Sequence, residues 1–151
     1  MSGPAESLMD AALAEARAAA ARGEVPVGAV VVEAATGALL AAAGNRVEEL
    51  GDATAHAEML ALRAASVGRG PRLTDCDLYV TLEPCPMCAQ AISLARIRRL
   101  YFGAADPKSG GVEHGPRIFA QATCHHAPEV YGGIAERDAG ALLKAFFAAR
   151  R

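Results

Sequence analysis

The chain has 151 residues, a net charge of −2 and 52% hydrophobic residues, which fits one domain, residues 1–151, with a buried core. It has no run of about 18 apolar residues that would predict a membrane span, and its N-terminal "MSGPAESLMD" lacks the basic and apolar regions of a signal peptide. Four cysteines are too few for a disulfide scaffold, so we expect a cytoplasmic protein with reduced thiols.

The charges are unevenly distributed along the chain. Residues 1–60 carry nine acidic and three basic side chains, whereas residues 61–151 carry eight acidic and twelve basic ones. A basic C-terminal half could contact phosphates, although charge alone is about as compatible with an ordinary solvated surface. The charge therefore neither predicts nor excludes a nucleic-acid partner.

Hydrophobic periodicity predicts the elements of the N-terminal half. Residues 4–22 are alanine-rich with apolar side chains on one face, which predicts an amphipathic helix that ends at Gly23. The β-branched run "VPVGAVVVE", a Thr-Gly turn and the apolar "ALLAAAG" predict a β-hairpin. A second helix is expected in "HAEMLALRAAS", with Asp52 and Thr54 as its N-caps.

The second half predicts an α/β unit. "DLYVTL" reads as a strand, residues 86–95 as a helix and "IRRLYFG" as a strand, so the two strands should pair in parallel across a helical crossover. Residues 106–126 are rich in Gly, Pro and His and predict a long loop, which in a compact domain is more often functional than idle. "APEVYGGI" predicts a short strand, and residues 136–149 a last helix.

Two cysteines stand three residues apart in "TLEPCPMCAQ". Pro86 fits the first turn of a helix, where its missing N–H is not needed, so Cys85 and Cys88 should lie on one side of that turn. A helix N-terminus favours thiolates, and a fixed thiolate pair is half of a site for a soft metal. Taken alone, the pair is also compatible with a redox-active dithiol or with half of a structural zinc site.

The stretch "TAHAEML" offers a third ligand. His56 and Glu58 face different ways on a regular helix, and alone they are typical of a solvated first turn. If two helix N-termini converge, His56 joins Cys85 and Cys88 around one zinc ion and leaves the fourth position open to water, as in catalytic zinc sites. Glu58 then stays outside the ligand set and is the candidate that moves protons.

The order of these motifs resembles a known family. "HAE" followed by "PCPMC" is similar to the signature of the zinc-dependent cytidine and nucleobase deaminase superfamily. The resemblance covers nearly the whole chain and narrows to the bacterial tRNA-specific adenosine deaminases through "VPVGAVVV", "GNR", "TAHAEMLALR", "TLEPCPMCAQAISLARIRRLYFGAADPKSG" and "LLKAFFAARR". It implies a three-layer α/β/α, cytidine-deaminase-like fold with a mixed five-stranded sheet.

The resemblance also implies a reaction and a partner. The reaction is hydrolytic conversion of the wobble adenosine of an arginine tRNA to inosine, with release of ammonia, and bound zinc lowers the pKa of water from about 15.7 to about 7 for it. The partner is the tRNA anticodon stem-loop, bound by a homodimer with one Zn2+ per subunit. The implied site residues are the zinc ligands His56, Cys85 and Cys88, the catalytic Glu58, and the substrate-binding residues Asn45 (target base), Asp106 (flanking ribose), Phe147, Arg150 and Arg151 (anticodon loop).

Two alternatives remain open from the sequence. A zinc-dependent deaminase of a free nucleobase or nucleoside, such as cytosine, guanine or cytidine, would share the zinc site without needing an RNA surface. A non-catalytic, zinc-stabilised binding module would need no carboxylate outside the ligand set, so Glu58 counts against it. His114 and the "CHH" run at 124–126 are interpreted as loop residues, Phe146 is expected in the core, and the resemblance assigns no role to residues 110–126.

Overall fold

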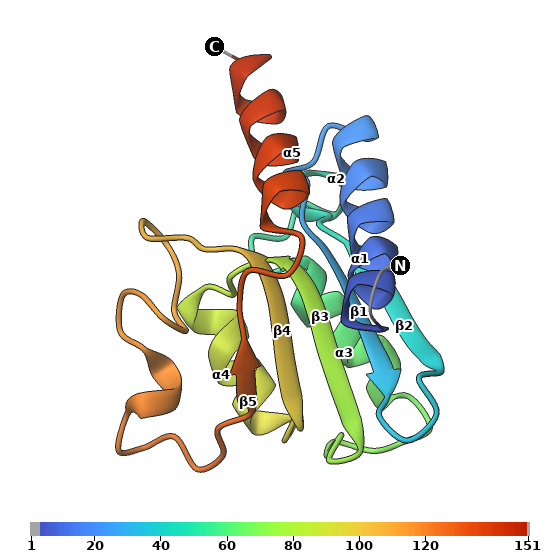
Figure 1. The fold of residues 1–151 in the computed structure, drawn as a ribbon, viewed down its shortest axis with the longest axis vertical. Coiled ribbons are helices and arrows are strands. Elements are labelled where there is room, and N and C mark those ends of the chain that lie inside the picture. Colours follow the sequence, from blue (N-terminus) through green and yellow to red (C-terminus); the bar gives the residue numbers. More distant parts are fainter. Residues whose placement is uncertain (1–3, 151) are drawn as a thin grey trace.

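The structure is a computed structural model that describes residues 4–150. Its elements are, in chain order, α1 (Pro4–Ala21), β1 (Gly28–Glu33), β2 (Leu39–Gly44), α2 (Val47–Leu50), α3 (Ala57–Ser66), β3 (Cys76–Leu82), α4 (Pro86–Leu94), β4 (Arg99–Ala104), the 3-10 helix η1 (Ile118–Ala120), β5 (Glu129–Tyr131) and α5 (Glu136–Ala148). Figure 1 shows the strands as one sheet, in the order β2-β1-β3-β4-β5. β1 is antiparallel to β2 and β3, whereas β3, β4 and β5 run parallel, so the sheet is mixed.

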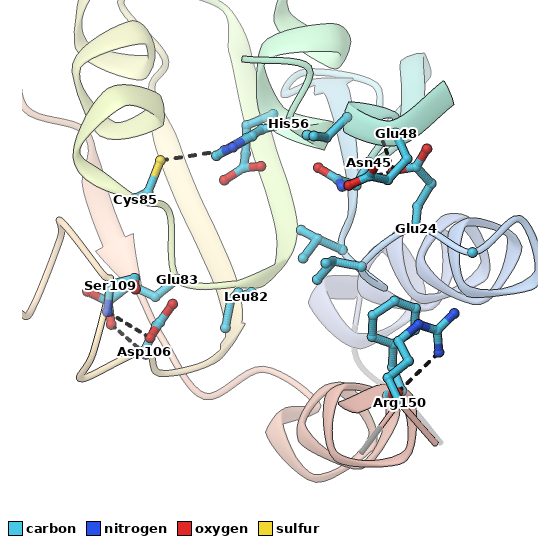
Figure 2. Close-up of a pocket in the computed structure, with 16 residues that line it drawn as sticks. Glu24, Asn45, Glu48, His56, Leu82, Glu83, Cys85, Asp106, Ser109 and Arg150 are labelled. Carbon is cyan, nitrogen blue, oxygen red and sulfur yellow. Dashed lines mark hydrogen bonds between the residues drawn. The ribbon is translucent and has the colours of Figure 1, made fainter. Parts of the chain in front are cut away.

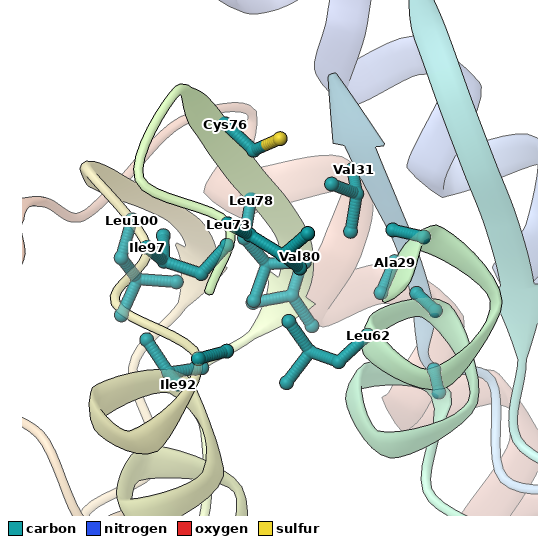
Figure 3. Close-up of a cluster of buried hydrophobic side chains, with 14 of the residues drawn as sticks. Ala29, Val31, Leu62, Leu73, Cys76, Leu78, Val80, Ile92, Ile97 and Leu100 are labelled. Atoms are coloured by element: carbon teal, nitrogen blue, oxygen red, sulfur yellow. The ribbon is translucent and has the colours of Figure 1, made fainter. Parts of the chain in front are cut away.

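Helices cover both faces of this sheet. Side chains of α3 and α4 form one apolar cluster with alternate residues of β1, Ala29 and Val31 (Figure 3). α1 and α5 contribute to a second cluster on the other face, which takes the intervening Val30 and Val32. Because β1 is buried on both faces, its sequence is a continuous apolar run. The expected α/β/α layers and mixed five-stranded sheet are confirmed.

The predicted helices and strands are present with small shifts at their ends, and the parallel pairing of β3 with β4 is confirmed. The prediction that Asp52 and Thr54 cap α3 was wrong, because the N-cap is His56. Asp52 Oδ1 instead accepts hydrogen bonds from the backbone N–H and the hydroxyl of Thr54, at 2.8 and 2.7 Å, in a local turn. The single turn α2 was not predicted. Within the described range, no helix has the length and hydropathy needed to cross a bilayer.

α1 lies so close to β1 that Gly28 has no room for a side chain. A Cβ atom there would lie 2.0 Å from the carbonyl oxygen of Ala12 and 2.6 Å from the backbone nitrogen of Ala16. We therefore expect Gly28→Ala to lower the free energy of unfolding, measured in urea, by about 1–3 kcal/mol.

Gly140→Ala is the matched control for this change. Gly140 lies inside α5, and the space around its Cβ position is open. Alanine is favoured over glycine in a helix, so the free energy of unfolding should rise by about 0.5–1 kcal/mol. A Gly28→Ala protein as stable as the wild type would contradict the close packing of α1 on β1.

Candidate active site

Three possible metal ligands lie at the N-termini of two helices. His56 is the N-cap of α3, Cys85 is the N-cap of α4, and Cys88 lies in the first turn of α4. Pro86 is at the start of α4, as the motif predicts. His56 Nδ1 lies 3.6 Å from Cys85 Sγ and 3.5 Å from Cys88 Sγ, and the three ligand atoms are all within 4.8 Å of one another. The two helix ends thus converge on one point.

The spacing of these atoms fits a zinc ion. Zn–S bonds of about 2.3 Å and Zn–N bonds of about 2.05 Å at tetrahedral angles separate nitrogen from sulfur by about 3.6 Å. The nitrogen–sulfur distances of 3.5 and 3.6 Å match that separation. Two thiols and an imidazole are donors that zinc prefers, and three protein ligands leave one tetrahedral position for water or substrate. Residues 4–150 contain no other group of three or more His, Cys, Asp or Glu side chains arranged to hold a metal ion.

The thiols and the imidazole also share protons. The hydrogen bond with Cys88 lowers the pKa of the Cys85 thiol to about 4; burial opposes this shift, and the hydrogen bond with His56 adds to it. The hydrogen bond with Cys85, together with burial, raises the pKa of Cys88, and the hydrogen bond with Cys85 also raises the pKa of His56. A thiolate that is hydrogen-bonded to a second thiol and to an imidazole suits cation binding, because a metal displaces the protons of its ligands.

Glu58 lies in the first turn of α3, beside this cluster but outside its three ligands. Only 4% of Glu58 is exposed, and burial raises the pKa of its carboxyl to about 7. A carboxyl with such a pKa can both accept and donate a proton at neutral pH, which general acid–base catalysis requires. The site therefore combines a metal-binding trio with a proton carrier.

The cluster opens onto a cavity of about 560 Å3, shown in Figure 2. The lining includes His56, Glu58 and Cys85 together with three of the residues predicted to bind substrate, Asn45, Asp106 and Arg150. In Figure 2, Asn45 and Asp106 lie on opposite sides of this space. The cavity thus joins the metal-binding trio to groups that can form hydrogen bonds with a polar ligand.

The end of α5 supplies the remaining predicted residues. Phe147 is 46% exposed and lines a neighbouring cavity, which shares Asp106 and Arg150 with the first. The Arg150 guanidinium lies 3.5 Å from the centroid of the Phe146 ring, and Phe146 is buried as expected. Arg151 lies outside the described residues.

Residues 3–104 match the sequence profile of the cytidine and deoxycytidylate deaminase zinc-binding region. The chain belongs to the cytidine and deoxycytidylate deaminase family. The deaminase is similar to the tRNA-specific adenosine deaminase of Agrobacterium fabrum (strain C58), with 57% identity over 144 residues that cover 95% of this chain and 93% of the relative. The family resemblance of the motifs is thereby confirmed.

Two solved structures are also similar to this deaminase. One comes from studies of A-to-I editing by tRNA:A34 deaminases at the wobble position, with a TM-score of 0.87 and 56% identity, covering 91% of this chain and 99% of that one. The other is the guanine deaminase of Nitrosomonas europaea, with a TM-score of 0.79 and 28% identity, covering 98% of this chain and 86% of that one. The fold therefore serves relatives with different substrates.

The deaminase holds a second buried carboxylate, Glu83, next to its metal-binding trio. Glu83 Oε2 accepts backbone N–H groups of Val112, Glu113 and His114 at 3.2, 2.9 and 3.2 Å. Glu83 Oε1 accepts the N–H of Asp106 at 3.0 Å and lies 2.7 Å from His114 Nδ1. Glu83 thus fixes the loop that carries Asp106 into the cavity wall. Glu83 stands in the motif "TLEPCPMCAQ", but no local pattern predicts its role, because its partners lie 23 to 31 positions further along the chain.

These bonds make the stability of the deaminase depend on the ionisation of Glu83. Burial raises the pKa of Glu83, but the hydrogen bonds from Asp106, His114 and their neighbours outweigh it and leave the pKa below the ordinary value of 4.5. The folded protein therefore binds this proton less tightly than the unfolded chain. The ionised Glu83 therefore stabilises the folded protein fully above pH 4.5, and this stabilisation is lost as the pH falls through the folded-state pKa.

Glu83→Gln tests this dependence on pH. A glutamine side chain has one acceptor oxygen, whereas Glu83 accepts hydrogen bonds with both of its oxygens. We therefore expect the free energy of unfolding at neutral pH to fall by about 1–3 kcal/mol. The difference from the wild type should shrink as the pH falls below about 4.5, because the wild-type carboxyl becomes protonated. Glu113→Gln removes an exposed carboxylate from the same loop and should change stability by less than about 0.5 kcal/mol. A difference that stays constant with pH would contradict this role of Glu83.

The run Cys124-His125-His126 has a structural role at the end of the long loop, as interpreted from the sequence. Cys124 Sγ lies 3.3 Å from Ser93 Oγ, which donates a hydrogen bond to the carbonyl oxygen of His126 at 2.6 Å. His126 Nε2 lies 2.6 Å from the carbonyl oxygen of Ile97. These contacts tie the long loop to α4 and to the segment before β4, so the structural role expected for this run is confirmed.

Proposed function

We propose that this deaminase hydrolyses the wobble adenosine of an arginine tRNA to inosine and ammonia. The observation that carries the proposal is the trio of His56, Cys85 and Cys88 beside the buried Glu58, on a cavity open to a ligand. The 57% identity with a tRNA-specific adenosine deaminase supports tRNA as the substrate, and the likeness to an A34 deaminase supports the wobble position. The choice of an arginine tRNA rests on the motif resemblance.

In the proposed mechanism, His56, Cys85 and Cys88 hold one Zn2+ per chain, which when bound makes hydroxide available near neutral pH by lowering the pKa of water to about 7. Glu58 accepts a proton from the attacking water and delivers it to N1 of adenine as the water oxygen bonds to C6. Glu58 then passes the second proton of that water to the exocyclic nitrogen. The C6–N6 bond breaks and ammonia leaves. A Glu58 pKa of about 7 suits both transfers.

The remaining site residues bind the RNA in this proposal. Asn45 hydrogen-bonds the target base and Asp106 contacts the flanking ribose, which their positions on opposite sides of the cavity support. Phe147, exposed at the end of α5, stacks on a base of the anticodon loop, and Arg150 and Arg151 approach its phosphates. Extruding a base costs a few kcal/mol, least in a loop that is already unpaired, which favours an anticodon loop over a duplex.

We also propose that the enzyme is a cytoplasmic homodimer. The four free cysteines among the described residues support a reducing compartment. Dimerisation is supported by the motif resemblance. Sizing of the protein over a range of concentrations tests it, and a monomer at every concentration would refute it.

A deaminase of a free nucleobase or nucleoside is the second candidate. Its support is the likeness to the guanine deaminase of Nitrosomonas europaea, whose fold is shared at 28% identity. The cavity of about 560 Å3 is within the size range of small-molecule sites. The same zinc ligands and Glu58 would serve this reaction, but the substrate would be a free base or nucleoside instead of a nucleotide within a tRNA.

One assay separates the two candidates. The purified, zinc-loaded protein is incubated with an arginine tRNA that carries adenosine at the wobble position, in parallel with free adenosine, cytidine, cytosine and guanine. We expect inosine in the tRNA and no turnover of the free compounds. The same tRNA with guanosine at that position is the matched control and should stay unchanged. Turnover of a free compound alone would favour the second candidate.

A further inference from the structure

A buried carboxylate that the reaction itself does not use forms part of the cavity wall. Glu24 lines the same cavity as Asn45, and only 2% of Glu24 is exposed. Glu24 Oε1 accepts the backbone N–H of Glu48 at 3.0 Å, and Oε2 accepts that of Glu49 at 2.7 Å. The chain reaches this point through a turn at Gly23, whose φ of +86° favours glycine. Both oxygens of Glu24 are therefore fixed as acceptors.

Glu24 also faces the side-chain amide of Asn45. Asn45 Nδ2 lies 3.5 Å from Glu24 Oε1, and Figure 2 shows the two side chains together at the cavity wall. Because Oε1 already accepts the N–H of Glu48, the amide must turn its NH2 group toward it. A rotation of the amide by 180° would set its oxygen against Oε1, so two acceptors would face each other in a buried place and the hydrogen bond between the two side chains would be lost. Glu24 thus selects one of the two amide orientations.

This orientation decides what Asn45 offers to a ligand. The backbone of Asn45 is fixed, since its N–H donates to Val27 at 3.1 Å and its carbonyl oxygen accepts from Arg22 Nη2 at 3.2 Å. Within residues 4–150, Asn45 Oδ1 has no hydrogen-bond partner, and no fully buried side-chain oxygen is left without one. Oδ1 is therefore not fully buried, and Asn45 lines the cavity, where this oxygen can accept a hydrogen bond.

We propose that Glu24 is a positioning residue for the substrate. It fixes the Asn45 amide so that Oδ1 accepts an N–H or O–H group of the bound nucleoside, and it leaves the second N–H of Nδ2 free to donate. Glu24 acts through Asn45 in this role. The inference rests on the function proposed above for Asn45, which is contact with the target base.

A purely structural role for Glu24 makes a different prediction. Its bonds to Glu48 and Glu49 stabilise α2, and losing them would disturb α2 whether or not Asn45 is present. If Glu24 acts through Asn45, its substitution affects substrate binding only while the Asn45 amide is there. A double-mutant cycle separates the two roles.

The cycle compares Glu24→Gln, Asn45→Ala and the double variant with the wild type, on the tRNA or on whichever free compound the wild type deaminates. Glutamine keeps the size of Glu24 but pairs with either end of an amide, so Asn45 loses its fixed orientation. We expect Glu24→Gln to raise KM about 3- to 10-fold, with kcat changed less than about 2-fold. The double variant should have the KM of Asn45→Ala. Glu49→Gln, which removes one exposed charge from α2, is the matched control and should keep the wild-type KM.

The exchanged pair Glu24→Gln/Asn45→Asp gives a second measurement. It restores a donor facing an acceptor and keeps an oxygen open to the cavity, so it should recover part of the KM lost in Asn45→Asp alone. No recovery, or a full effect of Glu24→Gln in the Asn45→Ala background, would overturn the proposal. A wild type that is inactive on tRNA counts against the proposed function only, because the cycle is then measured on the free compound.

Discussion

Replacing Glu58 by alanine is expected to lower kcat by about 10²–10⁴-fold while the bound zinc per chain stays unchanged. The reason is that Glu58 lies outside the three ligands and is nevertheless buried beside them, with a pKa of about 7. The alanine variant keeps all three ligands and loses the group that moves both protons. Steady-state kinetics together with elemental analysis of the same preparation measures the two effects.

Glu49→Ala serves as the control for this experiment. Glu49 is exposed on α2, where its side chain pairs with Arg46 at 3.2 Å, and the substitution should leave both kcat and zinc content unchanged. A Glu58→Ala enzyme with wild-type turnover would end the mechanism proposed here. Loss of zinc in that variant would instead assign Glu58 to the ligand set.

Cys88→Ser is expected to reduce the affinity for zinc by more than about 100-fold and activity in proportion. Changes to the partners that merely orient metal ligands cost 10- to 100-fold, and a serine hydroxyl is a far weaker zinc donor than a thiolate. Cys88 is fully buried, its Sγ lies 3.5 Å from His56 Nδ1, and Cys85, the other thiol of the trio, is itself a ligand and cannot take its place. Zinc content after dialysis against a buffered zinc concentration measures the change.

Cys124→Ser is the matched control, since it makes the same thiol-to-hydroxyl change away from the metal-binding trio. Cys124 contacts Ser93 and the carbonyl oxygen of His126, both of which a hydroxyl can also hydrogen-bond. Zinc content and activity should therefore match the wild type. If Cys88→Ser bound zinc as tightly as Cys124→Ser did, Cys88 would not be a ligand.

The cysteine pair of the metal-binding trio could be predicted because it follows a local rule. Pro86 fits the first turn of a helix, so Cys85 and Cys88 had to lie together at its start. The pair His56 and Glu58 was harder, because residues two apart face different ways on a helix. The structure resolves this difficulty at the helix boundary. His56 is still extended, with φ −73° and ψ 151°, and only Glu58 is helical, so both can reach the same site.

The sequence by itself determined the main helices and strands, though not α2, and the residue types that suit a zinc-dependent deaminase, because periodicity and turn preferences are properties of neighbouring residues. Only the tertiary structure decided that the two helix ends meet, and that Glu24 and Glu83 form the walls of the cavity. The partners of these two carboxylates lie 21 to 31 positions away. A buried carboxylate is satisfied by whichever backbone N–H groups the packed sheet brings to it, and that choice is made by the fold as a whole.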